Sequence, residues 1–515
     1  MSITRRGLGV GALGAGALAA IAPRALAYTT APWLRTETAN FIIYSGSSEA
    51  RVHDLADNLE AYDALLTHIT GAAAARSPLK LEVFLFRVPS AFYEAFGSVA
   101  PSVLGFYKGD AEILASVAQD RSSQGLDAQV ILFHEYAHHF MFAHFANAYP
   151  AWYVEGFAEL ASTTAFEPTR TVIGRASPAR TDTLSRGSWL PLQRLLALRP
   201  SDITTGDEED KFYAQSWLLA HYIFMTPGMD AKFRDYVAAW RQGGDPIAIF
   251  PDKFGKSIAD FESDVRQHYQ QGVHAIGLPR TGATAHAAAT VTPMPDSTND
   301  LLALSIRLRG GVSSEKAPAL LQLVHDRVTA PPQDAFAFMT LARAEAKIGD
   351  RARARALLEP YLETHAGDFE AQYLLGLTYL RDAEDAEGDA KTAALTQARH
   401  HFVAAYRQNE NYVPALFHYA ETFDGVMMTH EQMENTTNVA LLAHQLAPQV
   451  SEIGFLTAQW LMNLDRPREA IPILRAMAYD PHGGSGAKQA LDLLRQAETA
   501  AGLTPAPEQA PAAQH

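Results

Sequence analysis

Residues His134-Glu135-Tyr136-Ala137-His138 spell an HExxH motif, which strongly restricts the local structure of this chain. Residues four apart on an α-helix lie one turn above each other, so both imidazoles reach the same point beside the helix. Glu135 is rotated by about 100° from His134 and can address a water molecule held by a metal ion there. Apolar residues around the histidines favour a helix. The motif therefore predicts a helix that carries two metal ligands and a general base.

Two residues compete for the place of the third metal ligand. His144 lies six residues after His138, the offset of the third histidine in metzincins, but Met141 stands where metzincins have a glycine. A methionine continues the helix and turns His144 away from the metal. Glu155 lies seventeen residues after His138, on a second expected helix that returns antiparallel to the first. Geometry disfavours His144, and the two candidates imply different families.

The run Glu155-Gly156-Phe157-Ala158 resembles the EGFA segment of aminopeptidase-N-like gluzincins, whose third ligand is a glutamate on the helix after HExxH. The resemblance implies a catalytic zinc ion (Zn2+), one per chain, with the ligands His134, His138 and Glu155. It also implies that Glu135 is the general base. Gly156 is expected to allow close approach of the two ligand-bearing helices.

Three further residues gain candidate roles from the same resemblance. Glu159 occupies the position of an acid that orients a histidine ligand in gluzincins, but an exposed surface residue fits the pattern as well. Gluzincins stabilise the oxyanion with a tyrosine or histidine from later helices, which implies Tyr213 and, as the alternative, His221. Both residues also fit plain core positions. We expect Tyr213 to be the donor.

A wider resemblance covers residues 36–270 and concerns peptidase-MA-like domains, which are often joined to tetratricopeptide (TPR) repeats. It is carried by residues 40–45, 81–86 and 212–217. The implied fold is an α+β gluzincin-like metallopeptidase domain over residues 28–274, with a small N-terminal sheet and a helical active-site subdomain. Residues 111–117 are expected to form the strand before the metal helix, which in gluzincins is an edge strand that pairs with extended peptide substrate.

Export is predicted from the N-terminus. Residues 1–27 contain paired arginines, Arg5 and Arg6, an apolar stretch too short to span a bilayer, and the sequence Ala25-Leu26-Ala27. These features are typical of a signal peptide, and the arginines favour the twin-arginine route, with Sec export as the alternative. The mature chain is then expected in the bacterial periplasm or outside the cell, without a transmembrane anchor.

Composition excludes several functions. The 515 residues include no cysteine, which rules out cysteine catalysis and thiolate ligands. The formal net charge of −15 becomes −18 when residues 1–27, which carry three arginines and no acid, are removed. Nucleic acid is therefore not expected as a partner.

The sequence pattern changes in the second half of the chain. Residues 275–300 are rich in alanine, threonine, proline and glycine and are expected to form a linker. Leu341-Ala342 recurs as Leu375-Gly376 thirty-four residues later, the spacing of TPR repeats, so residues 301–501 are predicted as an all-α TPR solenoid. Residues 502–515 are expected to be a disordered tail. A TPR groove usually binds a protein partner, although repeats that only pack on the first domain fit the pattern too.

Together these patterns predict an exported zinc metallopeptidase that hydrolyses peptide bonds with metal-activated water and whose repeats recruit a protein substrate or partner. The alternative is a non-catalytic periplasmic TPR scaffold whose peptidase-like domain only binds metal. A third hypothesis, hydrolysis of a non-peptide amide bond, stays open because the sequence defines no substrate subsites.

Overall fold

The computed structural model describes most of the chain from Pro32 onward, and this part forms one compact unit. The predicted signal peptide, residues 1–27, lies outside the described residues, as do residues 506–515 of the predicted tail. The described residues are 32–72, 78–96, 105–119, 128–145, 148–198, 202–242, 244–279, 289–480, 483–503 and 505. Within these ranges no helix has the length and apolar character that crossing a membrane requires.

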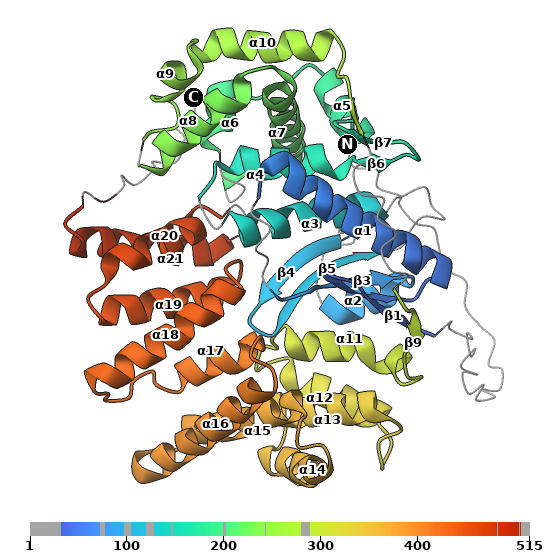
Figure 1. Ribbon diagram of the computed structural model, residues 1–515, viewed down its shortest axis with the longest axis vertical. Coiled ribbons are helices and arrows are strands. Elements are labelled where there is room, and N and C mark those ends of the chain that lie inside the picture. The colour runs from blue at the N-terminus through green and yellow to red at the C-terminus, as the bar shows by residue number, and fades with distance from the viewer. Residues whose placement is uncertain are drawn as a thin grey trace, which may run out of the picture. The chain divides into compact units, whose positions relative to one another are not determined.

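A six-stranded sheet, in the order β4-β5-β3-β2-β1-β9, forms the N-terminal part of the structure (Figure 1). Its strands are β1 (Leu34–Glu37), β2 (Phe41–Ser45), β3 (Leu81–Phe86), β4 (Gly105–Asp110), β5 (Ile113–Gln119) and β9 (Thr292–Pro293). Strands β2, β3 and β5 run parallel, and β4 runs antiparallel to β5. The small N-terminal sheet predicted from the sequence is therefore present.

The strand that precedes the metal helix is not the edge strand that we expected. Strand β5 covers the predicted segment, but it lies between β3 and β4, so β4 takes the edge. The reason is a hairpin: the chain turns at Ala111 and Glu112, and β4 adds itself to the outer side of β5. Strand β4 was not predicted from the sequence because its six residues, GFYKGD, include two glycines and an aspartate, which are uncommon in strands.

Helices cover both faces of the sheet. Helix α1 (Glu49–Thr70) begins at Ser48, whose side chain accepts a hydrogen bond from the Arg51 amide, and packs with the metal helix on one face. Helices α2 (Pro89–Phe96) and α11 (Thr298–Arg309) pack on the other face. Because α11 shares this core, the first residues of the predicted repeat region pack on the sheet.

A helical subdomain follows the sheet, together with a three-stranded sheet of order β6-β7-β8. Its elements are α3 (Ala128–His144), α4 (Ala151–Ser162), β6 (Ala165–Phe166), β7 (Arg170–Ile173), α5 (Pro178–Ser185), α6 (Leu192–Ala197), α7 (Gly206–Met225), α8 (Met229–Arg241), α9 (Phe250–Phe254), α10 (Ile258–Gln270) and β8 (Ile276–Pro279).

The predicted linker contains two strands. Strand β8 pairs with β7, and β9 pairs with β1, so both described ends of residues 275–300 are attached to the sheets. Residues 280–288 lie outside the described part of the chain. A composition rich in alanine, threonine and proline did not reveal these strands because their pairing partners are more than 100 residues away in the sequence.

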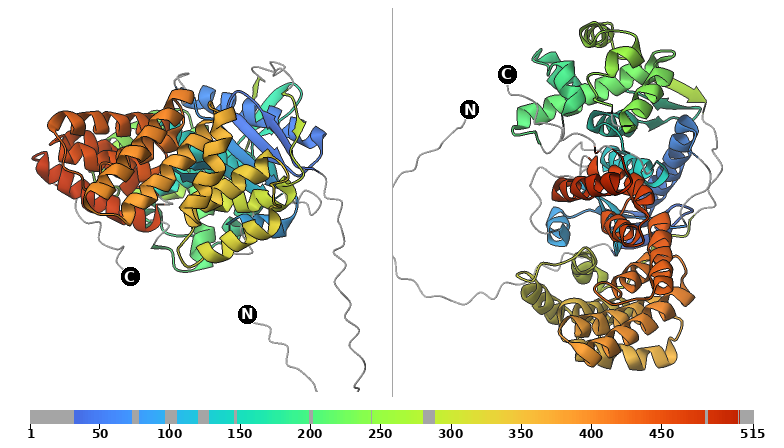
Figure 2. Two further views of the ribbon diagram at one scale, coloured as in Figure 1. Left: turned by 90° about the horizontal axis from the view of Figure 1, so that it is seen from below. Right: turned by 90° about the vertical axis from the view of Figure 1, so that its left-hand side faces the viewer.

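An array of helix pairs, here called the hairpin array, completes the fold (Figures 1 and 2). Helices α13 and α15 begin thirty-four residues apart, as the repeat spacing predicted, and each starts at an aspartate that caps its first turn, Asp334 and Asp368. The helices are α12 (Ala317–Arg327), α13 (Ala335–Ile348), α14 (Arg351–Thr364), α15 (Phe369–Glu384), α16 (Gly388–Gln408), α17 (Val413–Glu421), α18 (His430–Leu446), α19 (Ser451–Asn463), α20 (Pro467–Ala478) and α21 (Gly484–Ala500). The array is TPR-like in this arrangement.

Candidate metal centre

Helix α3 brings the two motif histidines together. His134 and His138 lie one turn apart, and their Nε2 atoms are 3.1 Å from each other. Tyr136, between them in the motif, points to the other side of α3, where its hydroxyl donates a hydrogen bond of 2.6 Å to Asp63 of α1. This buried bond ties α3 to the helix beside it and holds the histidines on the side of α4.

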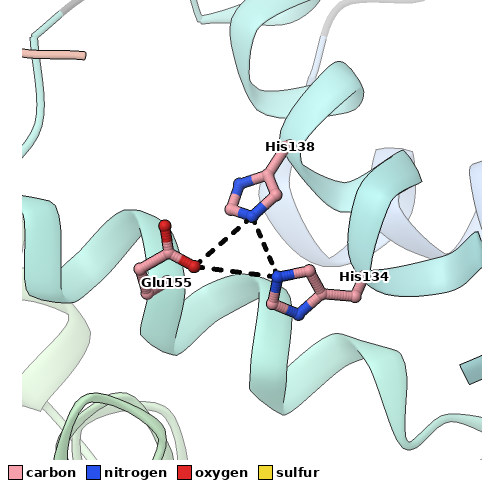
Figure 3. Close-up of side chains that lie close together, drawn as sticks. All are labelled: His134, His138 and Glu155. Carbon is pink, nitrogen blue, oxygen red and sulfur yellow. Dashed lines mark hydrogen bonds and ion pairs between the residues drawn. The ribbon is translucent and has the colours of Figure 1, made fainter. Parts of the chain in front are cut away.

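Helix α4 supplies the third residue of the cluster. The Oε2 atom of Glu155 lies 3.5 Å from Nε2 of His138 and 3.7 Å from Nε2 of His134 (Figure 3). Glu155 is wholly buried. Among the described residues, these three form the one group of histidine, aspartate or glutamate side chains whose ligand atoms all lie within 4.8 Å of one another.

The cluster fits a zinc ion. Ligands at about 2.0–2.1 Å from zinc in a tetrahedral arrangement are separated from each other by roughly 3.4 Å. The three distances here, 3.1, 3.5 and 3.7 Å, lie on both sides of that value. Two imidazoles and one carboxylate are also a donor set that zinc accepts. Burial lowers the pKa of His134, and His138 lowers it further, which favours the neutral imidazole that binds metal.

Glu135 and Glu159 flank the cluster in different ways. Glu135 is half-buried at the surface of α3, next to His134. Glu159 is 7% exposed, and its Oε1 atom lies 3.5 Å from Nδ1 of His134, the ring nitrogen that points away from the other ligands. Glu159 thus lies beside the His134 ring, and it is buried and not on a solvated surface.

Arg180 is a site residue that sequence reasoning missed. It lies on α5, and its guanidinium donates to both oxygens of Glu159, with distances of 3.0 and 2.6 Å. The same guanidinium lies over the Tyr213 ring, 5.0 Å from the ring centre. No sequence motif marks this arginine, because α5 meets α4 and α7 only through the tertiary fold.

Tyr213 lies on α7 near the cluster, at the wall of a cavity of about 240 Å³. Burial raises the pKa of its hydroxyl, and the negative charge of Glu155 raises it further, so Tyr213 stays a hydrogen-bond donor at neutral pH. The alternative donor, His221, is fully buried and faces another partner: its Nδ1 lies 2.9 Å from Nε2 of His268. Of the two candidates, Tyr213 is the one on which the charge of Glu155 acts, whereas His221 contacts His268.

His144 is not part of the cluster, and Gly156 does not have the contact expected from the sequence. His144 lies at the end of α3, outside the cluster, with its ring 4.4 Å from the Phe140 ring. Gly156 was expected to allow close approach of α3 and α4, but its close contact is with another helix. A Cβ at this position would lie 2.3 Å from the backbone oxygen of Ser216, so the glycine allows α4 to approach α7 instead.

Comparisons with known proteins show no family for this chain and find weakly similar solved structures. No protein-family model matches the chain, and no curated protein matches it. TTC0263, a thermophilic TPR protein of Thermus thermophilus, is 21% identical with a TM-score of 0.31, and the match covers 40% of this chain and 100% of that one. A structure of MamA from AMB-1 is 19% identical with a TM-score of 0.24, covering 32% of this chain and 94% of MamA. These similarities say nothing about the metal cluster.

Proposed function

We propose that this protein is a zinc-dependent peptidase of the gluzincin type. The observation that carries the proposal is the convergence of His134, His138 and Glu155 on one point, with Glu135 beside it in the HExxH motif. These residues would hold a zinc ion, which would lower the pKa of a bound water to about 7 and polarise the carbonyl of a peptide bond.

The chain's own residues have distinct roles in this proposal. Glu135 takes the proton of the attacking water and delivers it to the leaving amine. Tyr213 donates a hydrogen bond to the oxyanion that develops on the carbonyl oxygen. Glu159, held by Arg180, orients the His134 ring.

The other parts of the chain complete the proposal. The N-terminal segment directs export, by the twin-arginine route in preference to Sec, to the periplasm or the medium. The hairpin array binds a protein partner or substrate, as TPR-like folds commonly do.

Metal analysis of residues 28–515 tests the site directly. About one zinc ion per chain is expected in the unaltered protein and in His144→Ala, and a large loss in Glu155→Ala. Zinc that persists in Glu155→Ala and disappears in His144→Ala would contradict the ligand set.

Glu135→Gln separates an enzyme from a metal-binding scaffold. This variant should keep its zinc and lose hydrolysis of an unfolded protein substrate by several orders of magnitude, because the general base is removed. Zinc content and the release of fluorescent peptide are measured on the same samples. A zinc-loaded unaltered protein that cleaves neither peptides nor peptidoglycan fragments would favour the scaffold hypothesis.

A further inference from the structure

The tip of the β4–β5 hairpin enters the hairpin array. The array residues that contact this turn come from three helices, α13, α17 and α19. Figure 1 shows the end of the hairpin beside α17. The side chain of Glu112, at the turn, is only 8% exposed. The site formed by Arg343, Lys347 and His418 is here called the array groove, and the chain's own Glu112 occupies it.

Three cationic side chains surround the Glu112 carboxylate. Lys347 Nζ lies 2.5 Å from Oε1, and Arg343 Nη1 lies 3.4 Å from Oε2. His418 Nε2 is 3.9 Å from Oε1. Although burial alone would raise the pKa of the Glu112 carboxyl, Lys347, His418 and Arg343 hold it well below its usual value. Glu112 is therefore an anion in a site of matching charge.

The backbone of the turn is held as firmly as its side chain. Arg309 donates to the Glu112 carbonyl from Nε and Nη2, at 3.2 and 3.1 Å. The amide of Ala111 donates to Oε2 of Glu452 at 3.2 Å. Arg309 also pairs with Glu82 of β3, so the same arginine fixes the turn to the sheet.

A carboxylate is required to balance the positive charges of the array groove. Arg343 pairs with Glu370 and His418 with Glu421, which leaves one positive charge that, among the described residues, Glu112 balances. A buried, unbalanced cation is costly, so withdrawal of the turn favours its replacement by another carboxylate.

The turn is connected to the metal helix through β4. Strand β4 lies so close to α3 that a Cβ on Gly105 would be 2.4 Å from the Ile131 side chain. Tyr107 of β4 places its hydroxyl 3.3 Å from Nδ1 of His139, the residue after His138. The turn thus ends the same edge strand that contacts α3.

We propose that the array groove is a carboxylate-binding site whose internal ligand is Glu112, and that a partner protein enters it by presenting an acidic segment that displaces the β4–β5 turn. Displacement frees β4, the edge strand next to α3. This proposal rests on the partner role proposed above, with an acidic segment of the partner competing with Glu112 for the same site.

Hydrogen exchange of the zinc-loaded chain, residues 28–515, tests the internal ligand. In Glu112→Gln and Lys347→Met, the amides of residues 105–119 should exchange at least ten times faster than in the unaltered protein. Glu94→Gln is the matched control, because Glu94 forms another ion pair between the sheet side and the array, 2.6 Å from Arg327, away from the groove. Equal exchange in Glu112→Gln and the unaltered chain would overturn the proposal.

A peptide titration tests displacement without any altered groove residue. The probe is a synthetic peptide of residues 107–116, and its counterpart carries glutamine in place of Glu112. Both are added to the Glu135→Gln chain, so that hydrolysis does not consume them. The acidic peptide should accelerate exchange of the native turn in a saturable way, and the glutamine peptide should not. Acceleration by neither peptide, or by both equally, would overturn displacement by a carboxylate. Since exchange reports binding, this result is separate from any failure of the peptidase proposal.

Discussion

Arg180 joins residues that the sequence places far apart. Its guanidinium holds Glu159 on α4 and lies over Tyr213 on α7, and Glu159 in turn lies beside Nδ1 of His134. Groups that fix the ring of a metal-bound histidine keep its other nitrogen directed at the metal. We therefore expect Arg180 to be a positioning residue that acts through Glu159.

Arg180→Met should weaken zinc binding by about 10- to 100-fold, the usual effect of losing such a supporting group. Competition with a chromogenic chelator measures the affinity. Arg175→Met is the control, since Arg175 forms an ion pair of 2.6 Å with Glu167 in the same region but at an exposed position. Equal zinc affinities for the two variants would show that Arg180 has no positioning role.

Tyr213→Phe should lower kcat by about 100- to 1000-fold with a smaller change in KM, because an oxyanion donor acts mainly in the transition state. Steady-state kinetics on one peptide substrate provide the measurement. Tyr222→Phe, on the same helix but packed against Phe261, should leave kcat close to that of the unaltered protein. A normal kcat in Tyr213→Phe would assign the oxyanion to another donor.

The packing of helices α4 and α7 depends on the absence of a side chain at Gly156. The added methyl group of an alanine would meet the Ser216 oxygen at 2.3 Å and the Ala220 side chain at 3.0 Å. Both contacts involve atoms of a buried helix that cannot move independently. Glu155 is the adjacent residue, so this contact also sets where α4 holds its carboxylate.

Gly156→Ala should lower the free energy of unfolding by about 1–3 kcal/mol, the range for an overpacked core. Urea denaturation monitored by circular dichroism measures this change. Gly206→Ala serves as the control, because no atom lies within 4 Å of its added Cβ, and alanine favours a helix. A fully stable Gly156→Ala would show that α4 and α7 can separate freely.

Two of the contacts between the array and the rest of the described chain link it to the hairpin of the sheet and to the helical subdomain. One is the Glu112 turn. The other is α20, where Arg475 donates to the Arg241 carbonyl at 2.6 Å and Arg241 donates to the Ala148 carbonyl at 3.0 Å, in the connection between α3 and α4. The connection between α3 and α4 is thus linked to the array through Arg241, and the two halves of the chain are expected to unfold together.

The contact at Glu112 should depend on pH through His418. Burial alone would lower the pKa of His418, but Glu112 and Glu421 raise it from 6.5 to about 9. Because the pKa is higher in the folded protein, the stabilisation is complete below about pH 6.5 and is lost as pH rises through 9. The shift corresponds to a contribution on the order of 3 kcal/mol.

Melting temperatures between pH 6 and 10 measure this dependence, with His418→Asn as the comparison. The unaltered protein should lose more stability than the variant over that range. Parallel curves for the two proteins would contradict a stabilising charge on His418.

Local patterns determined much of this protein before any tertiary structure was known. HExxH requires only a helix to place His134 and His138 together, and the thirty-four-residue spacing requires only repeated helix pairs. The strands at β2 and β3 were recognisable because an apolar run or alternation of side chains is also a property of neighbours in the chain. Glu155 was identified through a resemblance and now lies within 3.7 Å of both histidines.

Contacts between distant segments were decided only by the tertiary structure. Three examples are the edge position of β4, the pairing of β8 and β9, and the hydrogen bond from Arg180 to Glu159. Each joins residues whose spacing in the sequence does not indicate that they are in contact. The same holds for Glu112, an ordinary turn residue in sequence that folding buries among Arg343, Lys347 and His418. The physical reason is that periodicity records which face a residue presents, whereas the partner on that face depends on how the elements pack.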